Sequence, residues 1–190
     1  MKGHEDGLFA YLCGMITAER KKKENIVEYL IYMWHVENII RVCDFDMEKI
    51  RAHMVSHCDE GAEVRERICA WYAGLADGMR AEGVTERGHL QCLVEVQERL
   101  ERLHGRLAGS AEEVAYAAAY GEVRAFVDGL RGRAGVEAPG VVETCISALY
   151  GYLVRRLRGL EPEGEAVEGV VLVNRMLTVL AERYEEFPDV

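Results

Sequence analysis

Two charged side chains interrupt the most apolar long segment of the chain, and they are the first candidates for chemistry. Glu37 and Arg41 lie four residues apart, acid before base, which is the favourable order for an ion pair on a helix. Because an isolated buried charge is costly, we expect these two to pair with each other or with a third group. Two interpretations stay open: a salt bridge that fixes the register of the helix, or part of a polar pocket between helices.

A histidine at the start of a leucine-rich seam is the second candidate. His89 follows the turn at Gly83, and Arg80 and Glu82 lie close to it in sequence. A buried imidazole with a carboxylate partner can donate or accept a proton near neutral pH, although a core histidine bonded to a backbone carbonyl is commoner. The pocket that we consider would be lined by Glu37, Arg41, Arg80, His89 and Glu143.

Two further histidines have the spacing of metal ligands. His53 and His57 are four residues apart, so they can share one helix face and one metal ion. The signal is weak, because the chain has no H-E-x-x-H motif and no third histidine nearby. An exposed polar helix end is the alternative, and we predict neither a metal nor a cofactor from this pattern.

One cysteine stands where a thiol can become reactive. Cys145 follows Glu143 and Thr144 near the start of a predicted helix, a position that can lower the pKa of a thiol. No adjacent base can be assigned to it, so we predict no nucleophile. The chain also lacks a glycine-rich phosphate loop and a G-x-S-x-G motif.

Segment 21–44 is the element that must position Glu37 and Arg41. Its apolar residues cover most of the circumference of a helix, which is typical of a helix inside a bundle. The broadest apolar face consists of Ile26, Tyr29, Met33, Val36 and Ile40. We therefore predict one helix from Lys21 to about Cys43 at the centre of the fold, with the basic run 20–23 at its start exposed to solvent.

The rest of the chain also has helical periodicity. Apolar residues recur at spacings of three and four in most later segments, including one that we expect to start at Thr85. No segment alternates with a period of two, so we predict no sheet. We read residues 1–17 as an N-terminal extension or short helix and 18–187 as the bundle domain. The predicted fold is an all-α, single-domain helical bundle of about seven or eight helices.

The composition limits the classes of partner and compartment. The 190 residues carry 23 basic and 33 acidic side chains, a net charge of −10 with histidine neutral. This balance argues against nucleic acid and against an anionic membrane as partners. The six cysteines form no C-x-x-C pair, which indicates reduced thiols. With no export signal and no apolar run of about 20 residues, we predict a cytoplasmic protein.

Three ordered segments resemble a known family. They are KKKENIVEYLIYMWHVENIIR (21–41), WYAGLADGMRAEGVTERGHLQ (71–91) and ETCISALYGYLVRRL (143–157), and together they resemble the bacterial domain of unknown function 4924 family. The resemblance runs from about Arg20 to Tyr184. It implies an all-helical, cytosolic protein and no particular activity. The residues that match the family pattern include Glu37, Arg41, Trp71, Tyr72, Arg80, Glu82, Gly83, Gly88, His89, Glu143, Tyr150 and Arg156.

Two classes of function remain. We expect first a non-enzymatic interaction or scaffold protein that uses an exposed helix face, with a homodimer as one form of assembly. The alternative is a small-molecule binder or enzyme with an interhelical polar pocket around Glu37, Arg41 and His89. The two differ in whether Glu37 and His89 point into one cavity that is open to solvent.

Overall fold

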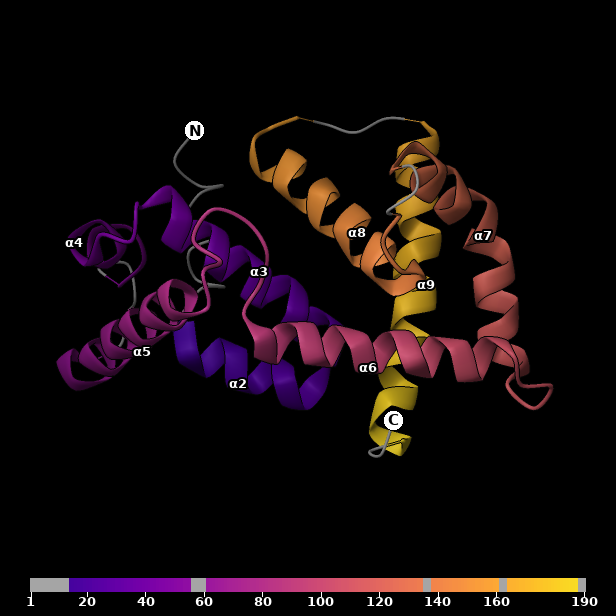
Figure 1. Cartoon of the computed structure of the whole chain (residues 1–190), viewed down its shortest axis with the longest axis horizontal. Coiled ribbons are helices and arrows are strands. Elements are labelled where there is room, and N and C mark those ends of the chain that lie inside the picture. Colours follow the sequence, from indigo (N-terminus) through magenta and orange to yellow (C-terminus); the bar gives the residue numbers. More distant parts are fainter. Residues whose placement is uncertain (1–13, 56–60, 135–137, 161–163, 188–190) are drawn as a thin grey trace. The chain divides into compact units, whose positions relative to one another are not determined.

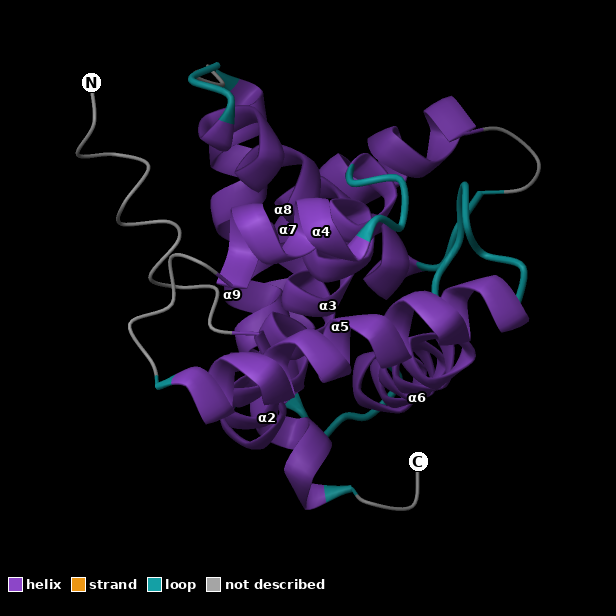
Figure 2. Ribbon diagram, turned by 90° about the vertical axis from the view of Figure 1, so that its left-hand side faces the viewer, coloured by secondary structure: helices purple, strands orange, loops and turns teal. Residues whose placement is uncertain are grey.

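The computed structural model describes residues 14–55, 61–134, 138–160 and 164–187, and this part of the chain contains eight α-helices and no strand (Figures 1 and 2). The prediction of an all-α helical bundle is therefore confirmed. The helices are α2 (Gly14–Glu24), α3 (Ile26–Val42), α4 (Met47–Ile50), α5 (Ala62–Ala81), α6 (Gln91–Ala108), α7 (Val114–Ala134), α8 (Val141–Leu157) and α9 (Glu165–Glu186), with a π-helical turn, η2 (Arg51–Val55), directly after α4.

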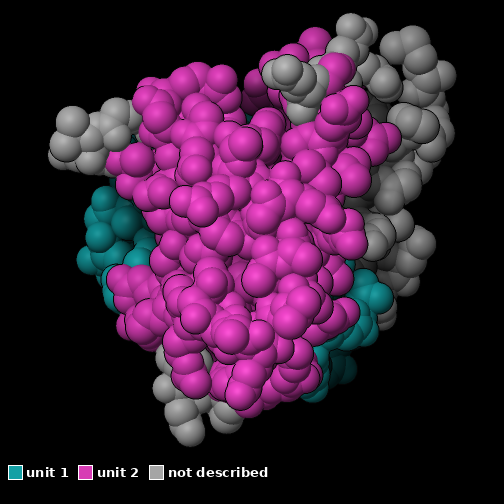
Figure 3. Space-filling model, turned by 90° about the vertical axis from the view of Figure 1, so that its right-hand side faces the viewer, with its two compact units in different colours: residues 1–94 teal, residues 95–190 magenta. Residues whose placement is uncertain are grey.

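The chain divides into two compact units, which Figure 3 shows in different colours. Unit 1 is Met1–Val94 and unit 2 is Glu95–Val190, so the boundary falls within α6. The N-terminal extension expected at residues 1–17 lies mostly outside the described residues, which begin in α2 at Gly14.

The central helix of unit 1 is α3, which packs against α2 and α5. Leu30, Val36 and Ile40 on α3 are completely buried, as the apolar circumference of the segment predicts. The predicted continuous helix from Lys21 is wrong, however, because the helix breaks at Asn25. The Asn25 side chain accepts hydrogen bonds from the backbone N–H groups of Val27 and Glu28, so it caps a new helix.

The basic run before this break is only partly exposed to solvent, which corrects the sequence interpretation. Lys21 is buried, and its Nζ lies 2.6 Å from Oε2 of Glu28 in the first turn of α3. The cation therefore joins α2 to α3 across the Asn25 break. Its neighbours Lys22 and Lys23 are exposed, in line with the prediction.

In unit 2, α9 packs against both α7 and α8. The leucine seam of α6 is buried at Leu100, Leu103 and Leu107, as its alternating spacing predicts. The ring of Phe126 on α7 lies so close to Gly169 on α9 that a β-carbon at position 169 would overlap it. Glycine therefore allows the close approach of α7 and α9.

Candidate functional site

The buried carboxylate of Glu37 lies at the centre of the candidate site, on α3 in unit 1. Its side chain has no solvent exposure, and each of its two oxygens has a partner from the segment that precedes α6. Oε2 lies 2.5 Å from Nδ1 of His89, and Oε1 accepts a hydrogen bond of 2.8 Å from the backbone N–H of Leu90. The two consecutive residues are thus held by one carboxylate from another helix.

The imidazole of His89 is fixed by a second contact. Its ring stacks on the indole of Trp34, with ring centroids 4.3 Å apart and an angle of 11° between the planes. The His89 side chain is 29% exposed, and no described residue binds its Nε2. With Glu37 ionised, Nδ1 carries the proton of this hydrogen bond, so Nε2 is the ring nitrogen that remains for another partner.

Arg41 lies one helical turn after Glu37 and binds the same segment. Its acceptors come before His89 in the sequence. Its Nη2 donates to the carbonyl oxygens of Val84 at 3.0 Å and Gly88 at 2.6 Å. Glu37 and Arg41 therefore each bind a third group, which was one of the two arrangements expected. The peptide groups on both sides of His89 are fixed by α3, one through Glu37 and one through Arg41.

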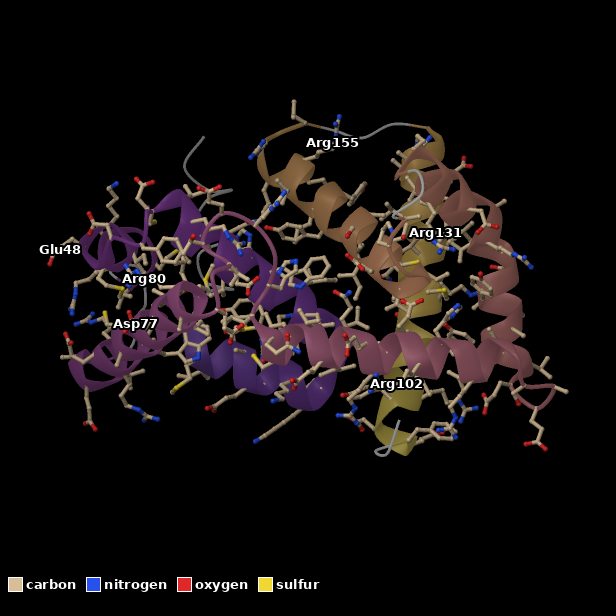
Figure 4. All side chains as sticks on the ribbon, viewed as in Figure 1. Glu48, Asp77, Arg80, Arg102, Arg131 and Arg155 are labelled. Carbon is tan, nitrogen blue, oxygen red and sulfur yellow. The ribbon has the colours of Figure 1, made fainter. Side chains whose placement is uncertain are left out.

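Arg80 has a comparable role at a different turn. From the C-terminal end of α5, on the side that faces α4, its Nη2 donates to the carbonyl oxygen of Phe45 at 3.2 Å, and its guanidinium lies 5.1 Å from the Phe45 ring centroid (Figure 4). Asp44 and Phe45 have φ angles of 55° and 60°. Residues other than glycine adopt this backbone conformation only at an energetic cost. Arg80 thus stabilises the unusual turn between α3 and α4.

The two arginines are related in a reciprocal way. Arg41 comes from α3 and binds the segment that follows α5, whereas Arg80 comes from α5 and binds the turn that follows α3. Each helix therefore fixes the chain at the end of the other. A planar guanidinium with five N–H donors suits this task, because it can bind several carbonyl groups without losing its charge.

The start of α6 differs from its prediction. Residues 82–90 precede the helix, which begins at Gln91 rather than near Thr85. The first backbone N–H of the helix, at Gln91, donates to Oε2 of Glu82 at 2.6 Å, next to the bond between Leu90 and Glu37. Two carboxylates thus satisfy N–H groups at a helix N-terminus, where negative charge is favourable.

Two other titratable side chains lie near Glu37. Burial raises the pKa of Tyr29, and the negative charges of Cys92 and Glu37 raise it further. Cys92 is an exposed residue, but partial desolvation of its thiol raises the pKa, with further increases from Glu82 and Glu37. Both groups are therefore neutral at pH 7, and neither is prepared to act as an anionic nucleophile.

The last member of the expected pocket, Glu143, belongs to unit 2. It lies in the first turn of α8 and is half-buried. The structure thus brings Glu37, His89 and Arg41 together in unit 1, and it places Arg80 at the turn between α3 and α4.

A polar cluster in unit 2 has no counterpart in the sequence interpretation. Both carboxylate oxygens of Glu101 accept backbone N–H groups at the start of α8, from Val141 and Val142, at 2.8 Å each. One turn later on α6, Nδ1 of buried His104 lies 2.7 Å from the hydroxyl of Tyr116. The spacing of Glu101 and His104 on the polar edge of the leucine seam is the only sequence signal for this cluster.

The position of Cys145 near a helix N-terminus does not lower the pKa of its thiol. Burial raises the pKa of the Cys145 thiol to about 12, and the charge of Glu101 raises it as well. Cys145 has no solvent exposure, so desolvation of the thiolate outweighs the favourable effect of the helix N-terminus.

The metal candidates cannot be placed. His57 lies outside the described residues, and so does the side chain of His53, whose backbone belongs to η2. Among the side chains that the structure describes, no group of three or more His, Cys, Asp or Glu residues is arranged to hold a metal ion. None of the described helices combines the length and the apolar character that crossing a membrane requires.

The geometry allows one kind of chemistry at this place. A partly exposed histidine with Nδ1 on a carboxylate and no described partner at Nε2 can accept or donate a proton. The surrounding bonds, however, all end on the backbone or side chains of unit 1 itself. The arrangement therefore accounts fully for the attachment of segment 82–90 to α3.

Comparison with known proteins adds the family and no activity. No curated protein and no solved structure matches the chain. One family model, described as a domain of unknown function (DUF4924), matches residues 15–188, which is nearly the whole chain. The matched region covers most of both units and every residue of the candidate site. The chain therefore belongs to the DUF4924 family.

Proposed function

We propose that this chain is a non-enzymatic interaction or scaffold protein of the cytoplasm, and that it can associate as a homodimer. The observation that supports this proposal is the use of the candidate site by the chain itself. Both oxygens of Glu37 and the Nη2 of Arg41 bind groups of segment 82–90. A catalytic carboxylate or a substrate-binding arginine needs hydrogen-bonding capacity that remains for a substrate.

Charge and cysteine chemistry also support the proposal. A net charge of −10 disfavours polyanionic partners and leaves proteins as the main class of macromolecule to bind. Cys43, Cys69, Cys92 and Cys145 are free, and three of them are buried, which suits a reducing compartment such as the cytoplasm.

The exposed edge of His89 supports a second candidate function, the binding or conversion of a small molecule. Its Nε2 has no partner among the described residues, and its ring is held by Glu37 and Trp34. A ligand with a proton to donate or accept could bind this nitrogen. The two candidate functions therefore differ in whether removing Nε2 of His89 abolishes the binding of a small molecule.

Two measurements on the purified chain test these functions. Sedimentation velocity over a wide concentration range should show a sedimentation coefficient that rises with concentration, as a homodimer requires. A single, concentration-independent monomer would reject the homodimer. A thermal-shift screen against a library of small metabolites should give no compound whose effect depends on His89.

The control for the screen is the variant His89→Asn, because an asparagine amide can still donate to Glu37 but offers no second ring nitrogen. A compound that raises the Tm of the wild type and leaves the Tm of His89→Asn unchanged would overturn the non-enzymatic proposal. It would also establish the candidate site as a ligand site. Arg87→Gln, on the same segment and exposed, controls for general effects of a substitution there.

A further inference from the structure

The C-terminal end of α8 presents three arginines and two leucines to solvent. Arg155, Arg156 and Arg158 are exposed, and no described residue forms an ion pair with any of their side chains. Leu157 is 37% exposed and Leu160 is 50% exposed, although both are large apolar residues. We call residues 155–158 with Leu160 the basic end of α8, and Figure 4 labels Arg155 there.

The backbone of this end is well defined because α8 closes with a Schellman motif. The N–H of Leu160 donates to the carbonyl of Arg155 at 3.0 Å, and the N–H of Gly159 donates to the carbonyl of Arg156 at 2.9 Å. Gly159 has a φ of 71°, which glycine adopts without strain. The chain thus folds back at Gly159, and Leu160 returns to the helix end that carries the three arginines.

This local charge contrasts with that of the whole molecule. Three cations for which no described residue supplies an ion pair lie within four positions, in a chain whose net charge is −10. Basic side chains near a helix C-terminus offset the negative end of the helix dipole, but that end carries only about half an elementary charge. The three guanidinium charges therefore exceed what the helix end offsets, and they lie beside the exposed side chains of Leu157 and Leu160.

We propose that the basic end of α8 is a docking site for an acidic protein segment that also carries apolar residues. Guanidinium groups bind carboxylates in a bidentate manner, which provides attraction and orientation. Leu157 and Leu160 provide the apolar area that such a partner can cover. This inference rests on the proposed role as an interaction protein, and it names the surface and the chemistry of the partner.

Charge complementarity favours a protein segment over a nucleic acid or a membrane. Three arginines are few compared with the cationic surface that a polyanion requires, and the remaining acidic surface repels a long polyanion. A short acidic segment needs to contact only the basic end. Its carboxylates would face the arginines, and its apolar side chains would cover the leucines.

The test uses the full chain and a labelled synthetic peptide in which glutamates alternate with leucines, with binding measured by fluorescence anisotropy. In a second peptide, serine replaces leucine. The test variant combines Arg155→Gln, Arg156→Gln and Arg158→Gln. The matched control combines Arg67→Gln, Arg87→Gln and Arg133→Gln, three exposed arginines elsewhere, so both variants lose the same charge. Circular dichroism confirms that both remain folded.

We expect the test variant to bind the glutamate–leucine peptide about tenfold more weakly than the wild type, since exposed charge pairs contribute little each and add up over three sites. The control variant should stay within about twofold, and the serine peptide should bind more weakly than the leucine peptide. Equal losses in the two variants, or no binding by the wild type, would overturn the docking site.

Two further arms use an anionic lipid vesicle and a single-stranded oligonucleotide in place of the peptide. Tighter binding of either one, lost in the test variant, would overturn the choice of an acidic protein segment. The sedimentation measurement on the wild type is independent of these results. A chain that self-associates but ignores the peptide would refute the docking site alone, whereas a small molecule acting through His89 would refute the proposed function.

Discussion

Glu37 shows how a single buried carboxylate can organise a chain segment. The residue has no contact with water, yet both oxygens have donors, and these donors come from adjacent residues 52 and 53 positions later in the sequence. A buried acceptor without donors would cost several kcal/mol, so the bonds to His89 and Leu90 are a condition for burying the group. The residue fixes segment 82–90 in the same step.

The first prediction concerns this carboxylate. Glu37→Gln should lower the free energy of unfolding by about 3 kcal/mol, because one of the two buried acceptor oxygens becomes an NH2 donor. Toward Leu90 this donor meets another N–H, and toward His89 it forces the ring into the tautomer that accepts at Nδ1. Urea unfolding followed by circular dichroism measures the change. Glu82→Gln removes a carboxylate from the same helix N-terminus but at an exposed position, so its loss should be much smaller. Equal losses in the two variants would contradict the role of burial.

His104 provides a prediction about pH. Burial lowers its pKa below the usual 6.5, with Glu101 opposing the shift and Arg131 adding to it. The unfolded chain therefore binds more protons than the folded chain between the two pKa values. The contribution of His104 to stability is complete above pH 6.5 and is lost as the pH falls toward the lower, folded pKa.

The variant His104→Asn tests this sign, because an amide oxygen can still accept from Tyr116 and does not titrate in this range. Unfolding free energies measured between pH 8 and pH 5 should fall less steeply in the variant than in the wild type. Part of the slope should remain, since burial also lowers the pKa of His35. Identical slopes would show that His104 is equally protonated in both states.

At the scale of elements, helices in both units begin at carboxylates supplied by other helices. Glu37 from α3 and Glu82 from the end of α5 serve the start of α6, and Glu101 from α6 serves the start of α8. The first N–H groups of a helix have no partner within the helix, and a carboxylate there is favoured by the helix dipole as well. Packing and capping are thus achieved by the same side chains.

A pair of glycines in and beside α8 tests this arrangement. A β-carbon at Gly140 would lie 2.5 Å from Oε2 of Glu101, so Gly140→Ala should displace the carboxylate and cost about 1–2 kcal/mol. Gly151 lies inside α8 with open space around it, so Gly151→Ala should stabilise by up to about 1 kcal/mol. Chemical unfolding of the two variants checks the opposite signs. A gain in Gly140→Ala would show that Glu101 moves without cost.

At the scale of the whole molecule, the division into two compact units predicts that a substitution destabilises only the unit in which it lies. Glu37→Gln removes a bond within unit 1, and Gly140→Ala disturbs a bond within unit 2. Hydrogen exchange followed by mass spectrometry should show faster exchange around Leu90 in the first variant and around Val141 in the second. Each variant should leave the other region unchanged. Faster exchange at both regions in either variant would show that the units open together.

The basic end of α8 and the His89 site differ in how much of each can be recognised from the sequence. The basic end of α8 is visible as RRLRGL in the sequence, but only the structure shows that no described residue forms an ion pair with these arginines and that Gly159 closes the helix. His89 is visible as a polar residue near a leucine seam. Its position before α6, rather than within it, depends on Glu37 and Glu82.

Periodicity alone determined much of this fold. The all-α class, the burial of α3 and the leucine seam of α6 follow from apolar spacing, because a helix places residues three and four apart on one face whatever its surroundings. The break at Asn25 was missed, although the residue type is a known cap, because the apolar pattern continues across it.

Tertiary structure decided which groups bind Glu37, Arg41 and Arg80. The sequence placed a carboxylate and a guanidinium four residues apart, and that spacing favours a bond between them as much as a bond to any other group. The partners of Glu37 and of the Arg41 Nη2 lie more than 40 residues away in sequence, and Phe45, whose carbonyl binds Arg80, lies 35 residues away. Such contacts depend on how α3, α5 and the start of α6 pack, and no local pattern in the sequence encodes that packing.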